Sequence, residues 1–285
     1  MVLDNMVEVV ELRQMLEKVL PPSMLPYAPK RFEVVGDICV LRLREGLLPY
    51  ASRIGEVFLE AIPGVKVVAV RVGEAAGEER VSPLIIIAGE QRTETVHREY
   101  GCLFKIDISK VYFTTKLSFE HQRVASQVKD GEVVLNMFSG VGGFSIPMAK
   151  RANCIVYSVD INPYAIKYLE ENAKLNRVEG KVIPVLGDAA SFTPPSPVDR
   201  ILMPLPLKAY DYLEHAVKTI KNGGTIHYYD VVVEKGENPI EELKRKVTGR
   251  LRELGVNTDV VYSRRMRSIA PRRSLAVLDV KVRWG

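Results

Sequence analysis

One segment near the middle of this chain constrains its fold most, because it joins two apolar strands through a glycine turn and a helix. The first apolar run, residues 133–137, leads into a turn with three glycines between residues 138 and 144. The second, residues 155–160, ends on a carboxylate. Glycines let backbone N–H groups approach a ligand without interference from a Cβ atom, and a carboxylate after the next strand can hold a ribose diol. The pattern predicts a nucleoside cofactor site.

Strand-like and helix-like segments alternate from this point onward. The expected strands are residues 133–137, 155–160, 182–186, 200–203, 224–229, 259–262 and 275–282, and the expected helices are residues 144–151, 165–175, 209–220 and 239–254. Strands that alternate with helices imply right-handed crossovers. We therefore predict an α/β fold with a doubly wound, Rossmann-like parallel sheet.

The chain before residue 112 has a different pattern. Helical spacing at residues 7–19 is followed by four prolines between 21 and 29. Strand-like runs at 32–43, 65–72, 84–87 and 104–108 and a helical run at 47–62 come next. We predict an N-terminal helix and linker (1–30), a small α+β domain (31–111), and the large cofactor domain (112–285), which opens with a helix at 117–129.

Composition limits the location and the redox state. Hydrophobic residues make up 47% and charged residues 26%, with no long uncharged apolar run and an acidic amino terminus. We therefore expect a cytoplasmic protein with no membrane segment. Cys39, Cys102 and Cys154 are scattered and lack pair spacing, so they are predicted to be reduced core residues. The four histidines show no metal-ligand spacing, so no metal is expected.

Positive charge gathers in the last quarter of the chain, although the net charge is only +5. The basic residues there are Lys244, Arg245, Lys246, Arg250, Arg252, Arg264, Arg265, Arg267, Arg272 and Arg273. A cluster of this size suits a phosphate backbone, and the alternative is a solvated helix face.

Three expected strand ends carry polar or glycine-rich residues: 139–143, Asp160 and 187–188. Ligands bind at such carboxyl ends in a doubly wound sheet. The turn reads Gly140-x-Gly142-Gly143 and continues with Phe144. It therefore differs from the Gly-x-Gly-x-x-Gly fingerprint of dehydrogenases, in which the third glycine stands three residues after the second.

Five segments follow one another in a distinctive order: Phe-Ser-Gly-Val-Gly-Gly-Phe, Asp-Ile-Asn-Pro-Tyr-Ala, Glu-Asn-x-x-Leu-Asn, Asp-Arg-Ile-Leu-Met-x-Leu-Pro and Gly-Gly-Thr-Ile-His-Tyr-Tyr. In this order they resemble the class I S-adenosylmethionine enzymes of the archaeal and eukaryotic tRNA guanine-37 N1-methyltransferase family. The resemblance covers roughly residues 30 to 283. It implies an enzyme that binds S-adenosylmethionine and the anticodon stem-loop of tRNA. We also expect a monomer. The implied cofactor residues are Asn136, Phe138, Ser139, Gly140, Gly142, Asp160, Ile161, Asp188, Ala189, Pro204 and Pro206.

The resemblance also implies catalytic and substrate-binding residues. Methylation of guanine N1 requires removal of its proton, and the residue that matches the family's general base is Glu120. By similarity and position, Arg80 would stabilise the charge that develops on O6. The residues implied to bind substrate are Lys116, His121, Arg265 and Arg267.

The chain departs from the family pattern at three places. Asn136 stands where the family has Asp, which keeps hydrogen bonding but removes a charge near the methionine ammonium group. Lys116 and His121 replace two arginines and cannot supply a guanidinium fork. Pro204 replaces an Asn, and we hypothesise that it widens the pocket for the tricyclic wyosine precursor made from the same nucleotide.

Two other functions stay open. The aminocarboxypropyl transferase of wybutosine synthesis shares the fold and the cofactor, but it tends to have Gly-Tyr where this chain has Pro204-Leu205. An RNA-binding protein with a degenerate pocket would explain Asn136 and Pro204, but the chain retains Asp160, Asp188 and Glu120. His97, His227, Tyr228, Tyr229 and Trp284 are interpreted as structural residues.

Overall fold

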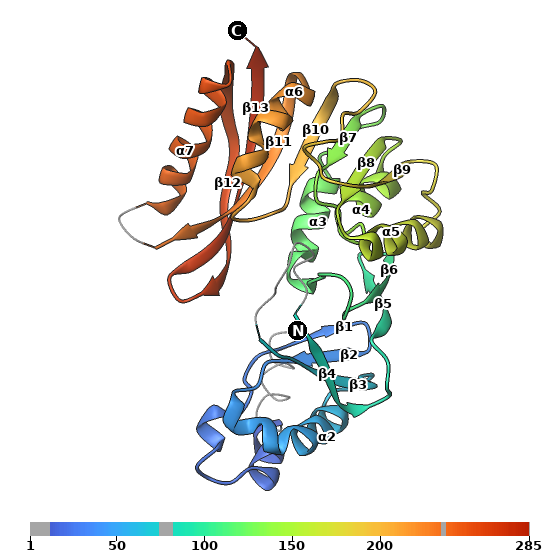
Figure 1. Ribbon diagram of the computed structural model, residues 1–285, viewed down its shortest axis with the longest axis vertical. Coiled ribbons are helices and arrows are strands. Elements are labelled where there is room, and N and C mark those ends of the chain that lie inside the picture. The colour runs from blue at the N-terminus through green and yellow to red at the C-terminus, as the bar shows by residue number, and fades with distance from the viewer. Residues whose placement is uncertain (1–11, 74–81, 235–237, 285) are drawn as a thin grey trace. The chain divides into compact units, whose positions relative to one another are not determined.

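The computed structural model describes residues 12–73, 82–234 and 238–284 (Figure 1). The chain divides into two compact units, Met1–Phe119 and Glu120–Gly285. The predicted boundary follows residue 111, whereas contacts group residues 112–119 with the first unit.

The N-terminal unit contains a four-stranded sheet in the order β1-β2-β3-β4 and a separate hairpin, β5-β6. The strands are β1 (Phe32–Val35), β2 (Ile38–Leu41), β3 (Val67–Arg71), β4 (Leu84–Gly89), β5 (Glu94–Glu99) and β6 (Cys102–Asp107). The helices are residues 12–19, η1 (Leu25–Tyr27), η2 (Glu45–Tyr50), α2 (Ala51–Ala61) and η3 (Thr115–Leu117). The strand-like run at 32–43 folds into two antiparallel strands because the chain turns at Gly36, which has φ +59°.

The N-terminal helix contributes to the core of this unit. Leu12, Leu16 and Leu20 are buried in one hydrophobic cluster with Leu41 and Phe58. Each such buried side chain contributes about 1.5–3 kcal/mol. This segment is therefore part of the packed unit rather than a separate linker, while residues 7–11 of the predicted helix lie outside the described residues.

The C-terminal unit is built on a seven-stranded sheet in the order β12-β13-β11-β10-β7-β8-β9. The strands are β7 (Val133–Asn136), β8 (Ile155–Asp160), β9 (Val182–Leu186), β10 (Val198–Met203), β11 (Ile220–Val233), β12 (Val256–Ala270) and β13 (Arg273–Trp284). Strands β7 to β11 pair in parallel, whereas β13 is antiparallel to both β11 and β12. The prediction of an α/β fold with a Rossmann-like sheet is confirmed, and β13 adds antiparallel pairing, so the sheet is mixed.

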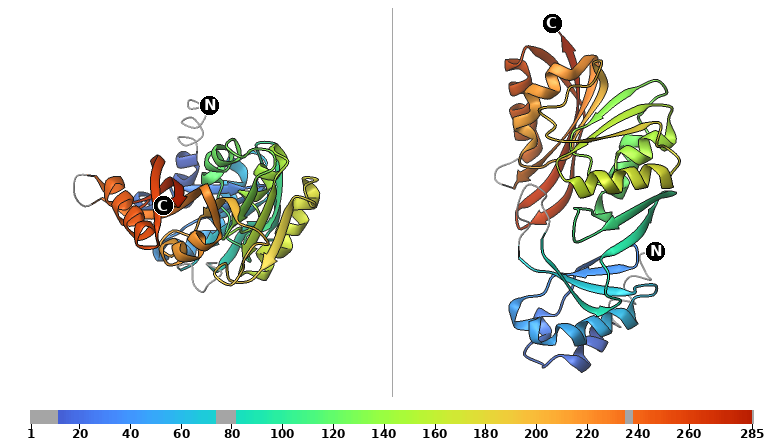
Figure 2. Two further views of the ribbon diagram at one scale, coloured as in Figure 1. Left: turned by 90° about the horizontal axis from the view of Figure 1, so that it is seen from above. Right: turned by 45° about the vertical axis from the view of Figure 1, so that its right-hand side comes forward.

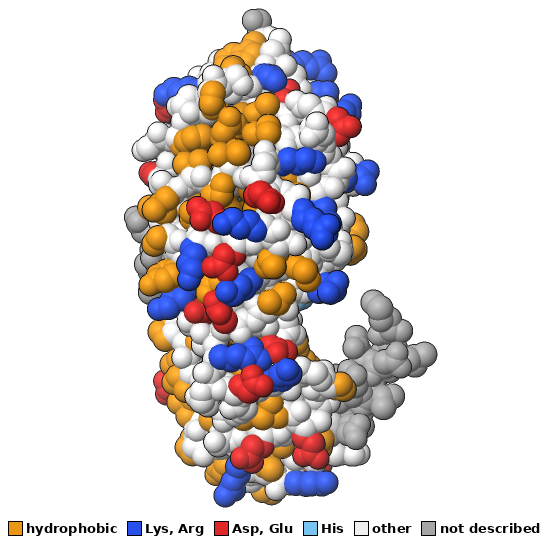
Figure 3. Space-filling model, turned by 90° about the vertical axis from the view of Figure 1, so that its right-hand side faces the viewer, with side chains coloured by type: hydrophobic (Ala, Val, Ile, Leu, Met, Phe, Trp, Pro, Cys, Tyr) orange, Lys and Arg blue, Asp and Glu red, His pale blue; other side chains and the backbone are white. Residues whose placement is uncertain are grey.

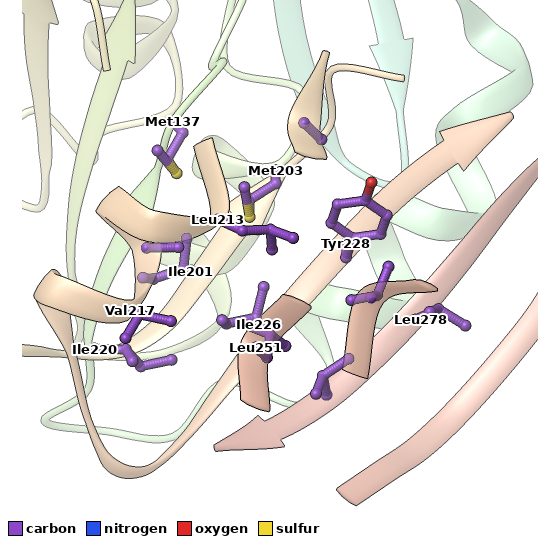
Figure 4. Packing of buried hydrophobic residues seen from close by; sticks show 14 of the residues in the cluster. Met137, Ile201, Met203, Leu213, Val217, Ile220, Ile226, Tyr228, Leu251 and Leu278 are labelled. Atoms are coloured by element: carbon purple, nitrogen blue, oxygen red, sulfur yellow. The ribbon is translucent and has the colours of Figure 1, made fainter. Parts of the chain in front are cut away.

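Helices cover both faces of this sheet (Figures 1 and 2). They are α3 (Ser118–Ala125), α4 (Ser145–Arg151), α5 (Pro163–Leu175), η4 (Ala209–Tyr212), α6 (Leu213–Thr219) and α7 (Pro239–Glu253). The face toward α6 and α7 is apolar: Ile201, Tyr228, Leu213 and Leu251 share one buried cluster (Figure 4). The opposite face, toward α3 and α4, carries buried polar residues that are described below.

The last three strands are longer than the expected runs at 224–229, 259–262 and 275–282. Strand β12 continues through Arg264, Arg265 and Arg267, where its side chains are mostly exposed and bulges interrupt its pairing with β13. At exposed and bulged positions apolar and polar residues no longer alternate. The strand-like pattern in the sequence therefore ends before the strand itself does.

No helix among the described residues is long and apolar enough to cross a lipid bilayer. The three cysteines are free and buried, as predicted. Burial raises the pKa of the Cys39 thiol to about 12.

Candidate functional site

The turn after β7 requires glycine for two reasons. Gly140 has φ +53° and Gly142 has φ +98°, a region that side chains other than glycine rarely adopt. A Cβ atom on Gly142 would lie 2.7 Å from Leu169 Cδ1 and 2.8 Å from Ile146 Cγ1. The turn can therefore pack against α4 and α5 only if this position has no side chain.

Asp160, at the carboxyl end of β8, is fixed beside this turn. Its carboxylate accepts hydrogen bonds from the N–H of Gly140 (2.7 Å) and from the N–H of Asn162 (3.0 Å). The bond to Gly140 joins the ends of two neighbouring parallel strands. A carboxylate held here by backbone donors suits a ribose diol, as the sequence predicts.

Asn136, the last residue of β7, has an unsatisfied buried oxygen. The side chain is fully buried, and its Nδ2 donates to Ser145 Oγ at 3.0 Å, which also accepts from Ser158 Oγ at 2.8 Å. Its Oδ1 has no hydrogen-bond partner in the described structure. Leaving such an atom unpaired costs about 1–3 kcal/mol, so an ammonium donor from a ligand would fit here.

The remaining predicted cofactor residues flank these two positions. Asp188 is exposed, and its side chain accepts from Ala190 N at 3.0 Å. Ile161, next to Asp160, is 43% exposed, which offers an apolar surface to a planar ring. Phe138 packs edge-to-face on Tyr212 at 4.9 Å, and Ala189 is buried. Together with Ser139, these residues offer the charge and apolar surface that S-adenosylmethionine needs.

The loop after β10 contains the two predicted prolines, Pro204 and Pro206, both half-buried. Leu207 follows with φ +75°, a strained conformation for leucine, and is 67% exposed. Its backbone N–H donates to Asp230 Oδ1 at 3.0 Å. The buried Asp230 also accepts from the Tyr228 hydroxyl at 2.9 Å, so β11 holds this loop in place.

The predicted general base, Glu120, lies at the start of α3 and is 2% exposed. Arg123 holds the carboxylate with a fork, Nε to Oε2 at 2.8 Å and Nη2 to Oε1 at 2.6 Å. The hydroxyl of Tyr229, on β11, donates to Oε1 at 2.7 Å. Burial, together with the nearby Glu120 charge, raises the pKa of Tyr229 well above its ordinary value, so the hydroxyl stays a donor.

Asp279, on β13, binds the other side of Arg123. Its carboxylate accepts from Arg123 Nη1 at 2.6 Å and from Nη2 at 3.0 Å. Although burial alone would raise the pKa of Asp279, the hydrogen bonds from His227 and Arg123 and the charge of Arg123 hold it well below its ordinary value. Tyr262, on β12, lies under the guanidinium, with 4.3 Å between Arg123 Cζ and the ring centroid.

His227 extends this buried network across the sheet. Its Nδ1 lies 2.7 Å from Asp279 Oδ1, and its Nε2 lies 2.7 Å from Arg200 Nη1. Because a guanidinium can only donate, Nε2 accepts, and the proton of the neutral ring is on Nδ1 and is donated to Asp279. Burial lowers the pKa of His227, which agrees with a neutral ring. Arg200 ends the network with a fork onto Glu132 at 3.0 and 3.2 Å.

The predicted substrate-binding residues are not brought together within one unit. Lys116 is in the N-terminal unit, 3.8 Å from Glu33 Oε2. His121 is 4% exposed and packs edge-to-face on Phe144 at 4.6 Å, so it supports the glycine turn. Arg265 pairs with Glu234 at 2.8 Å, while Arg267 has a buried Nε that no described group accepts. Arg80 lies outside the described residues.

The partners of Glu120 were not identified from the sequence as site residues. The signals for them are nonetheless present: Arg123 follows Glu120 by three residues on a helix, a spacing at which side chains meet. Asp279 is a lone acid inside an apolar strand, where burial requires a partner. Within the described residues, no group of three or more His, Cys, Asp or Glu side chains is placed to hold a metal ion.

Comparison with known proteins gives two family matches that together cover most of the chain. Residues 95–254 match the TRM5/TYW2 methyltransferase domain, and residues 12–93 match the TYW2 N-terminal domain.

Three relatives show the degree of similarity. The tRNA (guanine(37)-N(1))-methyltransferase Trm5b of Pyrococcus abyssi is 42% identical, over 92% of this chain and 78% of its own length. The tRNA 4-demethylwyosine(37)-methyltransferase Taw21 of Saccharolobus solfataricus is 39% identical, over 88% and 94%. The tRNA(Phe) (4-demethylwyosine(37)-C(7)) aminocarboxypropyltransferase of Pyrococcus horikoshii is 34% identical, over 95% and 96%.

Solved structures agree. The crystal structure of Trm5b from Pyrococcus abyssi superposes with a TM-score of 0.86 at 40% identity, over 95% of this chain and 81% of that one. A complex of aTrm5 with tRNALeu superposes at 0.83 and 34% identity, over 95% and 78%. The complex of Pyrococcus horikoshii TYW2 with MeSAdo superposes at 0.80 and 32% identity, over 96% and 98%.

Proposed function

This chain belongs to the TRM5/TYW2 methyltransferase family, and we propose that it transfers a methyl group from S-adenosylmethionine to N1 of guanosine 37 in tRNA. One observation carries the proposal: a single unit holds both a nucleoside-type strand edge at Asp160 and a buried carboxylate at Glu120. Methylation of a ring N–H needs both a bound methyl donor and a base. A protein that only binds the cofactor would need the strand edge at Asp160 but not the buried carboxylate.

Four residues would hold the cofactor. Asp160 would bind the ribose hydroxyls, Gly140 and Gly142 would let the chain approach closely, and Asn136 Oδ1 would accept from the ammonium group. When bound, S-adenosylmethionine supplies a methyl group already activated by its positive sulfur. The protein then has to place the acceptor nitrogen in line with that methyl group, and such placement lowers barriers strongly.

Glu120 would remove the proton from guanine N1, and Arg80 would stabilise the charge that moves toward O6. Exclusion of water strengthens both interactions, and Glu120 is buried. The catalytic roles of both residues are proposals.

The RNA would be held by basic side chains of the long β12–β13 hairpin, including Arg265 and Arg267. On the face shown in Figure 3, by contrast, acidic and basic side chains are interspersed and form no single basic field. A complex of the related aTrm5 contains tRNALeu, which supports tRNA as the partner. The anticodon stem-loop, a monomeric state and a cytoplasmic location stay predictions.

A second acceptor is favoured by a specific observation. The match to this chain covers 94% of Taw21, which is named as a tRNA 4-demethylwyosine(37)-methyltransferase. The tricyclic base would need a wider pocket, and Pro204 in place of an amide supplies one way to widen it. Aminocarboxypropyl transfer is the rival outcome, supported by the match of residues 12–93 to the TYW2 N-terminal domain.

The proposed function is tested by incubating the enzyme with S-adenosylmethionine and an unmodified tRNA transcript carrying G37, then digesting the RNA and identifying nucleosides by mass spectrometry. We expect 1-methylguanosine from the G37 transcript and none from a matched transcript with A37. A parallel reaction uses tRNA that already carries 4-demethylwyosine. If neither the G37 transcript nor the tRNA with 4-demethylwyosine is methylated, the proposed function is contradicted.

A further inference from the structure

The two oxygens of Glu120 differ in how many hydrogen bonds they accept. Oε1 accepts two, from Arg123 Nη2 and from the Tyr229 hydroxyl. Oε2 accepts one, from Arg123 Nε, and no other described group donates to it. Each carboxylate oxygen has about two acceptor positions. Oε1 is therefore filled, and Oε2 keeps one position open.

The groups that hold Glu120 are themselves held from the strands beneath. Asp279 fixes the opposite edge of the Arg123 guanidinium, and Tyr262 lies under its plane. His227 and Asp279 are direct cross-strand partners on β11 and β13, so their bond is built into the register of the sheet. The side chain of Arg123 is 11% exposed and that of Asp279 is 2% exposed, so neither is free to move into water.

We propose that Tyr229, Arg123 and Asp279 are positioning residues that fix the Glu120 carboxylate so that Oε2 is the atom that takes the proton from the substrate. The inference rests on the proposed function, because it assigns an atom and a supporting shell to the base of that reaction. All three would act through Glu120 and not on the substrate itself.

The proton transfer balances in a simple way. The N1–H bond of guanine breaks, its proton forms a bond to Glu120 Oε2, and the electron pair stays on N1 for the methyl group. Oε1 remains hydrogen-bonded to Tyr229 and Arg123 throughout. The buried charged and titratable groups around this step are Arg123 on α3, Asp279 on β13, and Tyr229, His227 and Arg200 on β11 and β10.

Two adjacent tyrosines provide the test. Tyr229→Phe removes only the hydroxyl that donates to Glu120. Tyr228→Phe is the matched control, since Tyr228 is buried on the opposite face of the same strand and donates to another carboxylate, Asp230. Asp230 keeps its other donors, among them the backbone N–H groups of Leu207 and Val231. Both variants lose one oxygen atom and the buried hydrogen bond that it donates.

Single-turnover methylation of G37 tRNA is measured from pH 5.5 to 9 for the wild type and both variants, with cofactor affinity measured by calorimetry. In Tyr229→Phe we expect the rate to fall about tenfold. The loss should appear in the single-turnover rate rather than in binding, because Oε1 loses a donor that holds the carboxylate in place. Cofactor affinity should not change. Tyr228→Phe, whose hydroxyl helps to hold the loop after β10, should instead weaken cofactor binding.

The outcomes separate the two claims. A wild-type enzyme that does not methylate tRNA overturns the proposed function and this inference with it. An active wild type in which Tyr229→Phe changes the rate and the cofactor affinity in the same way as Tyr228→Phe overturns the inference alone. Arg123→Lys is a second probe, because lysine keeps the charge but cannot form the fork. A wild-type rate in that variant would also overturn the positioning role.

Discussion

At the scale of single residues, the candidate cofactor site depends on atoms that the sequence made conspicuous. Asp160 ends an apolar strand and Gly142 lies in a glycine-rich turn. Both features depend only on the neighbouring residues, so they are visible in the sequence. Arg123 and Asp279 are 156 positions apart, and only the folded sheet brings them to 2.6 Å. Local patterns therefore predicted the cofactor edge, whereas the partners of Glu120 depend on long-range pairing that spacing alone does not show.

Gly142 provides a prediction at this scale. Gly142→Ala places a methyl group where Leu169 and Ile146 already lie, on a backbone with φ +98°. We expect the free energy of unfolding to fall by about 1–3 kcal/mol, measured by urea denaturation. The affinity for S-adenosylmethionine, measured by calorimetry, should also decrease.

Gly180→Ala is the control, because no heavy atom lies within 4 Å of a Cβ at that position and its φ is not positive. It should change stability by less than about 0.5 kcal/mol. Equal effects of the two substitutions on cofactor affinity would show that the turn is not the binding element.

At the scale of elements, β11 and β13 set the polar face of the sheet. Their register pairs His227 with Asp279. Tyr229, two residues after His227, lies on the same face and contacts Glu120 on α3. The sequence interpretation placed His227 and Tyr229 among structural residues, and both are buried. It did not reveal that their partners link them to Glu120, because a strand pattern reports which face a residue lies on but not what it meets there.

The His227 ring predicts a pH dependence of stability. Its pKa is lowered in the folded protein, so the unfolded chain binds a proton more readily as the pH falls through about 6.5. The free energy of unfolding should therefore decrease below that pH, by at most about 1.4 kcal/mol per pH unit from this group.

His227→Gln removes the titrating ring while keeping one donor and one acceptor. Urea unfolding of the wild type and the variant between pH 7.5 and 5.5 should give a smaller slope of stability against pH in the variant. Identical slopes would show that His227 is not buried in its neutral form. The comparison uses slopes, so a uniform loss of stability in the variant does not affect it.

At the scale of the whole molecule, the order of strands and helices was predictable because each element carries its own periodicity. The direction of β13 was not predictable from the sequence. This strand lies between β11 and β12 and runs antiparallel to both, but its apolar pattern would be the same in either direction. Likewise, the helix at residues 12–19 joins the N-terminal core through leucines whose spacing predicts a helix but not its partner. Family membership is shown by both matched models.

The central claim, methyl transfer to tRNA, is tested most directly by identifying what remains of the cofactor after one turnover with unmodified tRNA. Methyl transfer leaves S-adenosylhomocysteine, whereas aminocarboxypropyl transfer breaks a different bond to sulfur and leaves methylthioadenosine. We predict that chromatography of the reaction will show S-adenosylhomocysteine in a one-to-one ratio with methylated tRNA. Methylthioadenosine as the product, or no tRNA-dependent consumption of the cofactor, would contradict the account.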